Sequence, residues 1–191
     1  MDKIRTFVAV PVNDQARDAV TSAEDDLRRA GADVKWVEAR NIHITLKFLG
    51  NVETGQLDQL QAALRSALSG VKPLEIILSG TGTFPSGKKH VRVVWVGITE
   101  GKQDLVKVAA AVEEGCAGLG FAREERPFSP HLTIGRVRRE SGQLAELAAR
   151  VSGYQFNPLK VEIDRVNLMR SELSPKGPTY TVLETVALEQ S

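Results

Sequence analysis

One short pattern that could do chemistry occurs twice in this sequence, a histidine and a threonine separated by a single residue. His43 and Thr45 lie in the run NIHITLKFLG, and His131 and Thr133 lie 88 positions later in the run SPHLTIGR. Both runs are typical of strands, in which successive side chains point to opposite faces. Each histidine is therefore expected to share a face with its threonine. Two of the three histidines of the chain lie in this pattern.

Two imidazoles that face one substrate could serve as general acid and general base in a single displacement, because histidine titrates near neutral pH. A threonine hydroxyl beside each of them could donate a hydrogen bond to an oxygen on which negative charge builds up. Such a set of groups suits transfer at phosphorus without a metal ion. A strained substrate such as a cyclic phosphodiester suits it best.

Other chemistries match the sequence less well. There is no HExxH or CxxC motif, and no carboxylate stands within two residues of either motif histidine, so a metal site would lack ligands. The GxSxG elbow of serine hydrolases is absent, as are the Walker A and GxGxxG loops that hold phosphates. A single histidine on a strand is usually structural, and the matched pair is what favours catalysis.

Composition indicates a globular, soluble protein with no membrane partner. The 191 residues are 42% hydrophobic and 26% charged, and no apolar run approaches the ~18 residues of a membrane span. The N-terminus lacks the pattern of a signal peptide, so we expect a cytoplasmic protein. Cys116, the single cysteine, has no partner for an internal disulfide and is expected to be buried.

The net charge of +1 does not indicate a broad nucleic-acid surface, so any such contact should be local. The basic residues that could provide it stand in two short groups: Lys88, Lys89, His90 and Arg92, and Arg136, Arg138 and Arg139. Short runs of this kind are more often only solvated, and His90 is expected to be a surface residue.

Hydrophobic periodicity predicts an order of strand, helix, His-x-Thr strand, helix and strand that occurs twice. The predicted strands are 4–12, 34–37, 41–50, 73–79, 90–98, 128–136, 159–169 and 180–188, and the predicted helices are 13–31, 54–70, 103–118 and 143–151. Residues 80–89 are rich in turn formers and separate pseudo-symmetric halves, about 1–80 and 90–191, of one domain. Both histidines would then face each other across one cleft. A slip in alternation near Asp164 suggests a bulge.

These runs, together with RTFVAVPV, VRVVWVGI and LMRSELSPKGPTY, resemble the 2H phosphoesterases, and among them the RNA 2',3'-cyclic phosphodiesterase (LigT or ThpR, "2'-5' RNA ligase") family. The resemblance covers nearly the whole chain. It implies a bilobal α+β fold whose antiparallel sheets line a central cleft. It also implies hydrolysis of a terminal 2',3'-cyclic phosphate on RNA to a 2'-phosphate, with no metal and no organic cofactor. The reverse 2'-5' ligation would use the same groups.

In terms of that family, His43 would be the proton donor to the departing 3' oxygen and His131 the proton acceptor that activates water. Thr45 and Thr133 would hold the phosphate oxygens. Which histidine plays which part does not follow from the sequence. Two other functions stay open: a 2H esterase for a small 2',5'-linked or cyclic nucleotide, and an RNA-binding module without catalysis. We expect a monomer.

Several neighbouring residues have uncertain orientations. Strict alternation places Arg136 on the face opposite His131, but a bulge at Gly135 would turn it toward the phosphate, and the match of HLTIGR to the family favours that phosphate-binding role. Lys47 is expected on the face of His43, and Phe48 on the opposite face, in the core. Phe84 and Phe128 are the candidates for stacking against a base.

Overall fold

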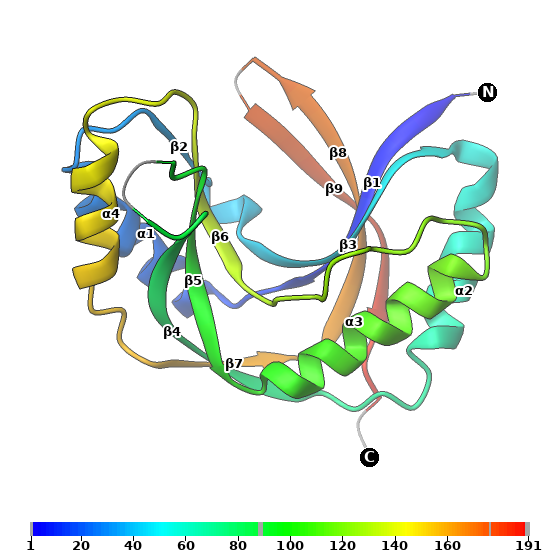
Figure 1. Cartoon of the computed structure of the whole chain (residues 1–191). Coiled ribbons are helices and arrows are strands. Elements are labelled where there is room, and N and C mark those ends of the chain that lie inside the picture. Colours follow the sequence, from blue (N-terminus) through cyan, green and yellow to red (C-terminus); the bar gives the residue numbers. More distant parts are fainter. Residues whose placement is uncertain (1, 88–89, 176, 190–191) are drawn as a thin grey trace.

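The computed structural model describes residues 2–87, 90–175 and 177–189 (Figure 1). Lys88 and Lys89, two of the basic residues considered above, lie outside the described residues. In the described residues the fold consists of two antiparallel sheets and four α-helices, which confirms the α+β prediction.

The first sheet has the strand order β3-β1-β8-β9. Its strands are β1 (Lys3–Pro11), β3 (His43–Glu53), β8 (Arg165–Ser174) and β9 (Gly177–Ala187). The second sheet has the order β2-β6-β5-β4-β7. Its strands are β2 (Val34–Trp36), β4 (Leu74–Phe84), β5 (Val93–Glu100), β6 (Leu132–Val137) and β7 (Leu159–Ile163). Figure 1 shows the two sheets spreading apart on one side, with the β8–β9 hairpin on one arm and β2 and β6 on the other.

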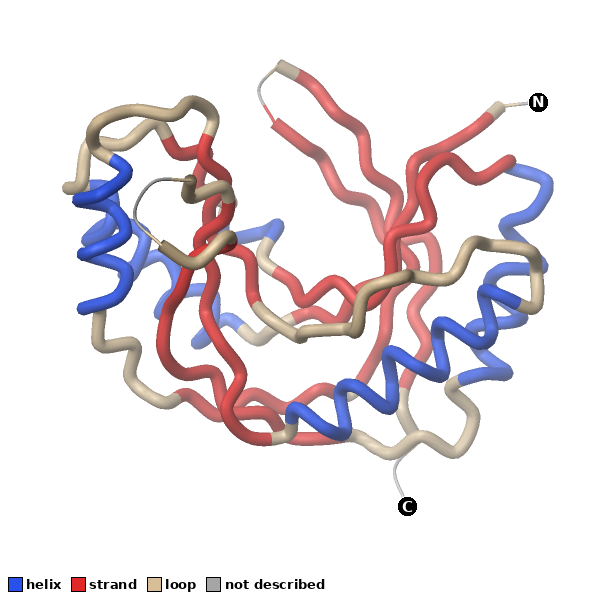
Figure 2. The backbone as a smooth tube through the Cα atoms, viewed as in Figure 1, coloured by secondary structure: helices blue, strands red, loops and turns tan. Residues whose placement is uncertain are grey.

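The helices lie on two flanks of the sheets, α1 with α4 and α2 with α3 (Figure 2). They are α1 (Asp14–Arg28), α2 (Leu57–Ala67), α3 (Lys102–Ala117) and α4 (Leu144–Gly153), with short 3₁₀ turns η1 (Ala39–Asn41) and η2 (Thr54–Gln56). Asn13 is the predicted N-cap of α1, and its Oδ1 accepts a hydrogen bond from the Ala16 amide at 2.9 Å. Each helix buries one apolar stripe, as its periodicity predicts.

The two halves of the sequence are interwoven. The run β3-β1-β8 in one sheet corresponds to β6-β5-β4 in the other, and each run pairs a His-x-Thr strand and the first strand of its own half with a late strand of the other half. This correspondence supports the hypothesis of a duplicated unit. Residues 80–84, expected in a separating loop, instead continue β4, which pairs with β5 as a hairpin.

The predicted strand 159–169 is divided between the sheets, so the expectation of one bulged strand is wrong. β7 ends at Ile163 and pairs with β4, whereas β8 begins at Arg165 and pairs with β1. The alternation slips at Asp164 because the chain passes there from one sheet to the other.

Buried apolar side chains from both sheets and all four helices form one continuous core. Cys116 is fully buried within it, as predicted, and burial raises the pKa of its thiol to about 11, so the thiol stays protonated at neutral pH. Among the residues that the structure describes, no helix is long and apolar enough to cross a membrane.

Candidate active site

His43 opens β3, and both nitrogens of its ring have partners. Nδ1 lies 2.7 Å from the carbonyl oxygen of Asn41, and Nε2 lies 3.0 Å from Oγ1 of Thr45. A carbonyl oxygen can only accept, so Nδ1 carries a hydrogen and donates it. In the neutral ring Nε2 is therefore the acceptor, and the Thr45 hydroxyl donates to it. The predicted placement of His43 and Thr45 on one face is confirmed.

The surroundings of His43 favour its neutral form. Burial lowers the pKa of the imidazole, the hydrogen bond to the Asn41 carbonyl raises it, and the charge of Arg136 lowers it. The net shift is downward from the ordinary value of 6.5. Without an anion nearby, His43 is accordingly neutral at pH 7.

His131 stands immediately before β6, which begins at Leu132, four residues later than the predicted strand 128–136. Its Nδ1 lies 2.8 Å from the carbonyl oxygen of Ser129, so here too Nδ1 donates and Nε2 is left as the basic nitrogen. The ring makes an edge-on contact with Phe84 at 5.2 Å between centroids. The two histidines thus share one tautomer, set in each case by the carbonyl two residues earlier.

A bulge in β3 reverses the alternation after Thr45. Thr45 pairs with Ala9 and Lys47 pairs with Val8, so Leu46 is the extra residue, and Phe48 then stands opposite Phe7. Lys47 points into the core, with a side chain only 4% exposed, and Phe48 comes to the face of His43 and is 58% exposed. Both expectations for these two residues were wrong, because strict alternation does not count a bulged residue.

A bulge at the matching place in β6 turns Arg136 toward the site. Thr133 pairs with Trp95 and Gly135 pairs with Val94, which leaves Ile134 as the extra residue. Arg136 therefore shares the face of Thr133, as the hypothesis of a bulge near Gly135 requires. A Cβ on Gly135 would lie 2.8 Å from a methyl carbon of Val34 and 3.0 Å from the Trp36 ring, so a larger residue would crowd β2.

Strands β3 and β6 adjoin although they belong to different sheets. The charge of Arg136 on β6 acts both on His43 of β3 and on Tyr180 of β9. The contact between β3 and β6 therefore brings the two motif strands together, and Arg136 lies near enough to His43 and Tyr180 to affect their pKa values. Thr133 is half-buried beside them.

Tyr180 is a site residue that sequence reasoning missed. Its ring lies 5.4 Å from that of His43 and 5.0 Å from that of Phe7, edge-on to both. The ring of Phe7 in turn lies 4.9 Å from that of His43, so the rings of Phe7, His43 and Tyr180 all contact one another. No local pattern distinguishes Tyr180 from other strand residues, because only the pairing of β9 with β8 brings it here.

The two residues proposed for stacking differ. Phe84 is 39% exposed and its ring contacts both the indole of Trp95, at 5.3 Å, and the imidazole of His131. Phe128 is half-buried and packs against the core. His90 is exposed at the surface, as expected, beside Glu140 at 3.2 Å.

Behind the site, Lys47 ties three segments together. Its Nζ donates to both carboxylate oxygens of Glu113 on α3, at 2.9 and 2.8 Å, and to the carbonyl of Ala122 at 2.9 Å. Glu113 also accepts from the amide of Glu124. The strand that carries His43 is thus anchored to the connection that leads to His131.

Within residues 2–87, 90–175 and 177–189, no three side chains of His, Cys, Asp or Glu gather into a set that could hold a metal ion.

Residues 12–175 match the family model described as "2'-5' RNA ligase superfamily". The chain belongs to this superfamily. A relative from Methanothermobacter thermautotrophicus, named "RNA 2',3'-cyclic phosphodiesterase", is 39% identical over 188 residues, which cover 97% of this chain and 100% of the relative. The family expected from the motifs is therefore confirmed.

Solved structures support the same fold as the superfamily match. The protein TT0787 of Thermus thermophilus aligns with a TM-score of 0.80 at 27% identity, over 97% of this chain and 98% of its own. Escherichia coli LigT in its apo form aligns with a TM-score of 0.78 over 100% of both chains at 23% identity, a similarity of fold alone.

Proposed function

We propose that this protein hydrolyses the terminal 2',3'-cyclic phosphate of RNA to a 2'-phosphate. The observation that carries the proposal is the shared tautomer of His43 and His131 on adjoining strands. Each ring is fixed through Nδ1 to a backbone carbonyl, so each offers Nε2 for proton transfer. The activity named for the Methanothermobacter relative supports the same conclusion.

The reaction uses one histidine as acceptor and the other as donor. Nε2 of His131 takes a proton from a water molecule, whose oxygen then bonds to phosphorus. The bond between phosphorus and the 3' oxygen breaks, and Nε2–H of His43 gives its proton to that oxygen. Thr45, Thr133 and Arg136 hold the other phosphate oxygens, on which charge accumulates. The ribose keeps a 2'-phosphate and gains a 3' hydroxyl.

His43 must be protonated to act as the donor, although burial and Arg136 lower its pKa in the free protein. The substrate supplies the missing counter-charge. A phosphodiester anion at this place offsets Arg136 and favours the imidazolium form. The Thr45 hydroxyl, no longer needed as a donor to Nε2, is then free to donate to a phosphate oxygen.

The same groups would carry out 2'-5' ligation when the 5' hydroxyl of a second RNA takes the place of water. His131 would then remove the proton from that hydroxyl as its oxygen bonds to phosphorus, and His43 would protonate the departing 3' oxygen. We include this 2'-5' ligation in the proposal because an alcohol can replace water as the nucleophile for the same acid and base.

Phosphorus NMR of a short RNA ending in a 2',3'-cyclic phosphate tests the proposal in the presence of EDTA. We expect wild-type protein to convert the signal to that of a 2'-phosphate, and His43→Ala and His131→Ala each to leave it almost unchanged. His90→Ala, which removes the surface histidine, is the matched control and should behave as wild type. If the signal of the cyclic phosphate persists with wild-type protein, the proposal is wrong. Small 2',5'-linked dinucleotides would then be the next substrates, followed by a binding assay with plain RNA.

A further inference from the structure

The face of the first sheet that carries His43 continues beyond the proposed catalytic residues. Along β1, Arg5, Phe7 and Ala9 share this face by alternation, and the bulge in β3 adds Phe48 opposite Phe7. Phe7 is almost fully buried, so its ring acts as a floor between His43 and Phe48. The rings of Phe7 and Phe48 lie 6.2 Å apart. Phe48 is thus an exposed aromatic ring, and only the ring of Phe7 separates it from the imidazole of His43.

Phe48 and Arg136 occupy equivalent places in the two halves. Each follows its motif histidine by five positions, and each is turned to the site by a bulge at the third position. The second sheet therefore presents a cation where the first sheet presents an exposed aromatic ring. A nucleotide needs both kinds of partner, since it combines an anionic phosphate with a flat base.

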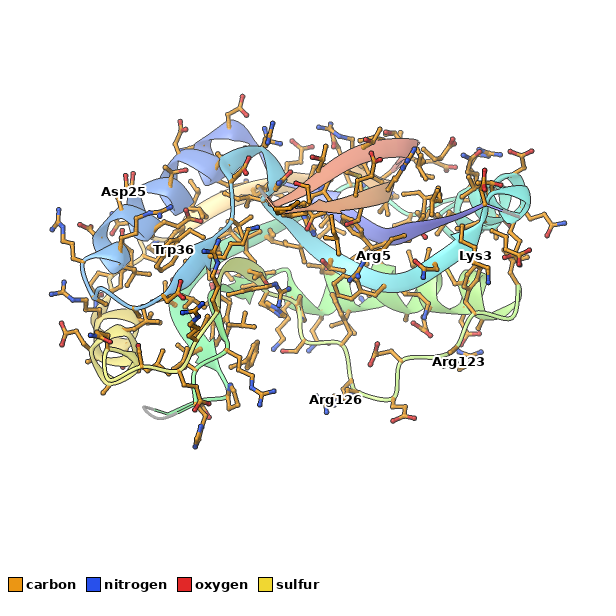
Figure 3. The ribbon with its side chains drawn as sticks, turned by 90° about the horizontal axis from the view of Figure 1, so that it is seen from above. Lys3, Arg5, Asp25, Trp36, Arg123 and Arg126 are labelled. Atoms are coloured by element: carbon orange, nitrogen blue, oxygen red, sulfur yellow. The ribbon has the colours of Figure 1, made fainter. Side chains whose placement is uncertain are left out.

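Arg5 provides a second cation on the aromatic side. It is exposed and lies opposite Asn51, and no acidic side chain pairs with it in the part of the chain that the structure describes. Lys3, two residues before it, is already occupied by Glu53 at 3.8 Å. Figure 3 shows Lys3 and Arg5 following one another along β1. The charges of Arg5 on β1 and Arg136 on β6 both act on Tyr180, so a guanidinium group from each sheet lies near that ring.

The proposed reaction places the nucleoside on this side. In an in-line displacement, the attacking water and the departing 3' oxygen lie on opposite sides of phosphorus. Water stands near His131 of the second sheet, so the 3' oxygen and its ribose stand near His43 of the first. The base and the 5' carbon of the same nucleoside then extend over β1 and β3, where Phe48 and Arg5 lie.

We propose that Phe48 and Arg5 form a nucleotide subsite on β1 and β3, in which Phe48 stacks against the base and Arg5 binds the phosphodiester on the 5' side of the reacting nucleotide. This proposal rests on the proposed function and names its substrate class. The site takes the end of an RNA chain in preference to an isolated nucleoside 2',3'-cyclic phosphate.

Three unreactive product analogues separate the two contacts. Adenosine 2'-phosphate carries the base, ribose 2-phosphate lacks it, and adenosine 2',5'-bisphosphate adds the 5' phosphate. Isothermal titration of wild-type protein should show tighter binding with each added group. For the base we expect an increase in affinity of about 5- to 150-fold, from the usual contribution of base–aromatic stacking. For the 5' phosphate we expect about 10-fold, as for a charge-assisted hydrogen bond.

Each variant should remove one of these two increases in affinity. In Phe48→Ala, the ratio of affinities between adenosine 2'-phosphate and ribose 2-phosphate should fall close to one, and Phe48→Trp should restore it. In Arg5→Gln, the gain from the 5' phosphate should disappear. Arg29→Gln, which removes a guanidinium from the end of α1, is the charge-matched control and should keep both gains.

Several outcomes would overturn the subsite. Wild-type protein could bind all three analogues equally or not at all, or Phe48→Ala could weaken all three by one factor, which would mean that Phe48 acts only through the packing of Phe7. Turnover of an RNA 2',3'-cyclic phosphate is measured separately. Normal turnover without the increases in affinity from the base and the 5' phosphate would contradict the subsite alone. Both increases in affinity without turnover would instead contradict the proposed hydrolysis.

Discussion

Arg136 of β6 and His43 of β3 are electrostatically coupled across the two sheets. Burial lowers the pKa of the imidazole, the hydrogen bond to Asn41 raises it, and the Arg136 guanidinium lowers it. This coupling exists because a bulge in β6 turns Arg136 back to the face of Thr133. The guanidinium that we propose as a phosphate ligand therefore also affects the protonation of the proposed donor.

Arg136→Gln should raise the pKa of His43, because it removes a charge that disfavours the imidazolium. Burial would still hold the value below 6.5. An NMR titration of the histidine ring protons measures this shift. Addition of inorganic phosphate should raise the pKa of His43 further in wild-type protein than in the variant. Arg150→Gln, on the exposed surface of α4, should leave the titration unchanged, and an unaltered His43 pKa in Arg136→Gln would contradict the coupling.

Thr45→Val should lower kcat about 100- to 1000-fold, in the range seen when one donor to a developing charge is lost. Valine keeps the branched shape but lacks the hydroxyl that lies 3.0 Å from Nε2 of His43. Thr45→Ser keeps the hydroxyl and should recover most of the rate. Steady-state kinetics on an RNA 2',3'-cyclic phosphate compares the three proteins. Equal losses in the valine and serine variants would point to packing rather than hydrogen bonding.

Glu24 on α1 should make the folded protein less stable as the pH rises. Burial raises the pKa of this carboxyl from 4.5 to about 8, against the lowering effect of Arg28. Between these values the folded state binds more protons than the unfolded state, so the contribution is complete below pH 4.5 and is lost as the pH rises through about 8. The loss is on the order of 5 kcal/mol.

Urea denaturation of wild-type protein and Glu24→Gln at several pH values measures this effect. The difference in unfolding free energy between the two proteins should shift in favour of the variant from about pH 5 to about pH 8. His43 contributes in the opposite direction below pH 6.5, but equally in both proteins. Two parallel curves across this range would contradict a protonated Glu24.

Lys47→Met should destabilise the protein by about 3–5 kcal/mol, because it leaves the carboxylate of Glu113 without its partner. The double variant Lys47→Met, Glu113→Leu should recover much of that loss, since no unpaired charge remains. Urea denaturation of the two single variants and the double variant gives the coupling free energy. A coupling near zero would mean that the 2.8 Å contact adds no net stability.

A substitution at the bulge in β6 should impair phosphate binding as much as a substitution of a motif residue. Gly135→Ala places a Cβ 2.8 Å from Val34 and 3.0 Å from Trp36, which should displace β6 or β2 and move Arg136. We expect a loss of phosphate affinity of about 10-fold or more, comparable to the loss of a charge-assisted contact. Gly142→Ala, where a Cβ meets nothing within 4 Å, is the control. Titration with phosphate compares them, and unchanged affinity in Gly135→Ala would show that the strand tolerates the contact.

The sequence by itself determined the elements that local patterns encode. Strand alternation placed His43 with Thr45 and His131 with Thr133, since neither pair spans a bulge. Helical periodicity and the Asn13 cap predicted α1, because a cap and an apolar stripe are set by neighbours in the chain.

Only the tertiary structure decided the rest. Leu46 and Ile134 are extra residues because β3 and β6 each place two residues opposite one residue of the paired strand. The sequence of one strand does not specify its register with another strand. Phe48 and Lys47 therefore exchanged the faces that alternation predicts for them. The passage of the chain between sheets at Asp164, and the arrival of Tyr180 beside His43, likewise depend on contacts between distant segments. Such contacts are set by packing and strand pairing, which no local spacing of residue types contains.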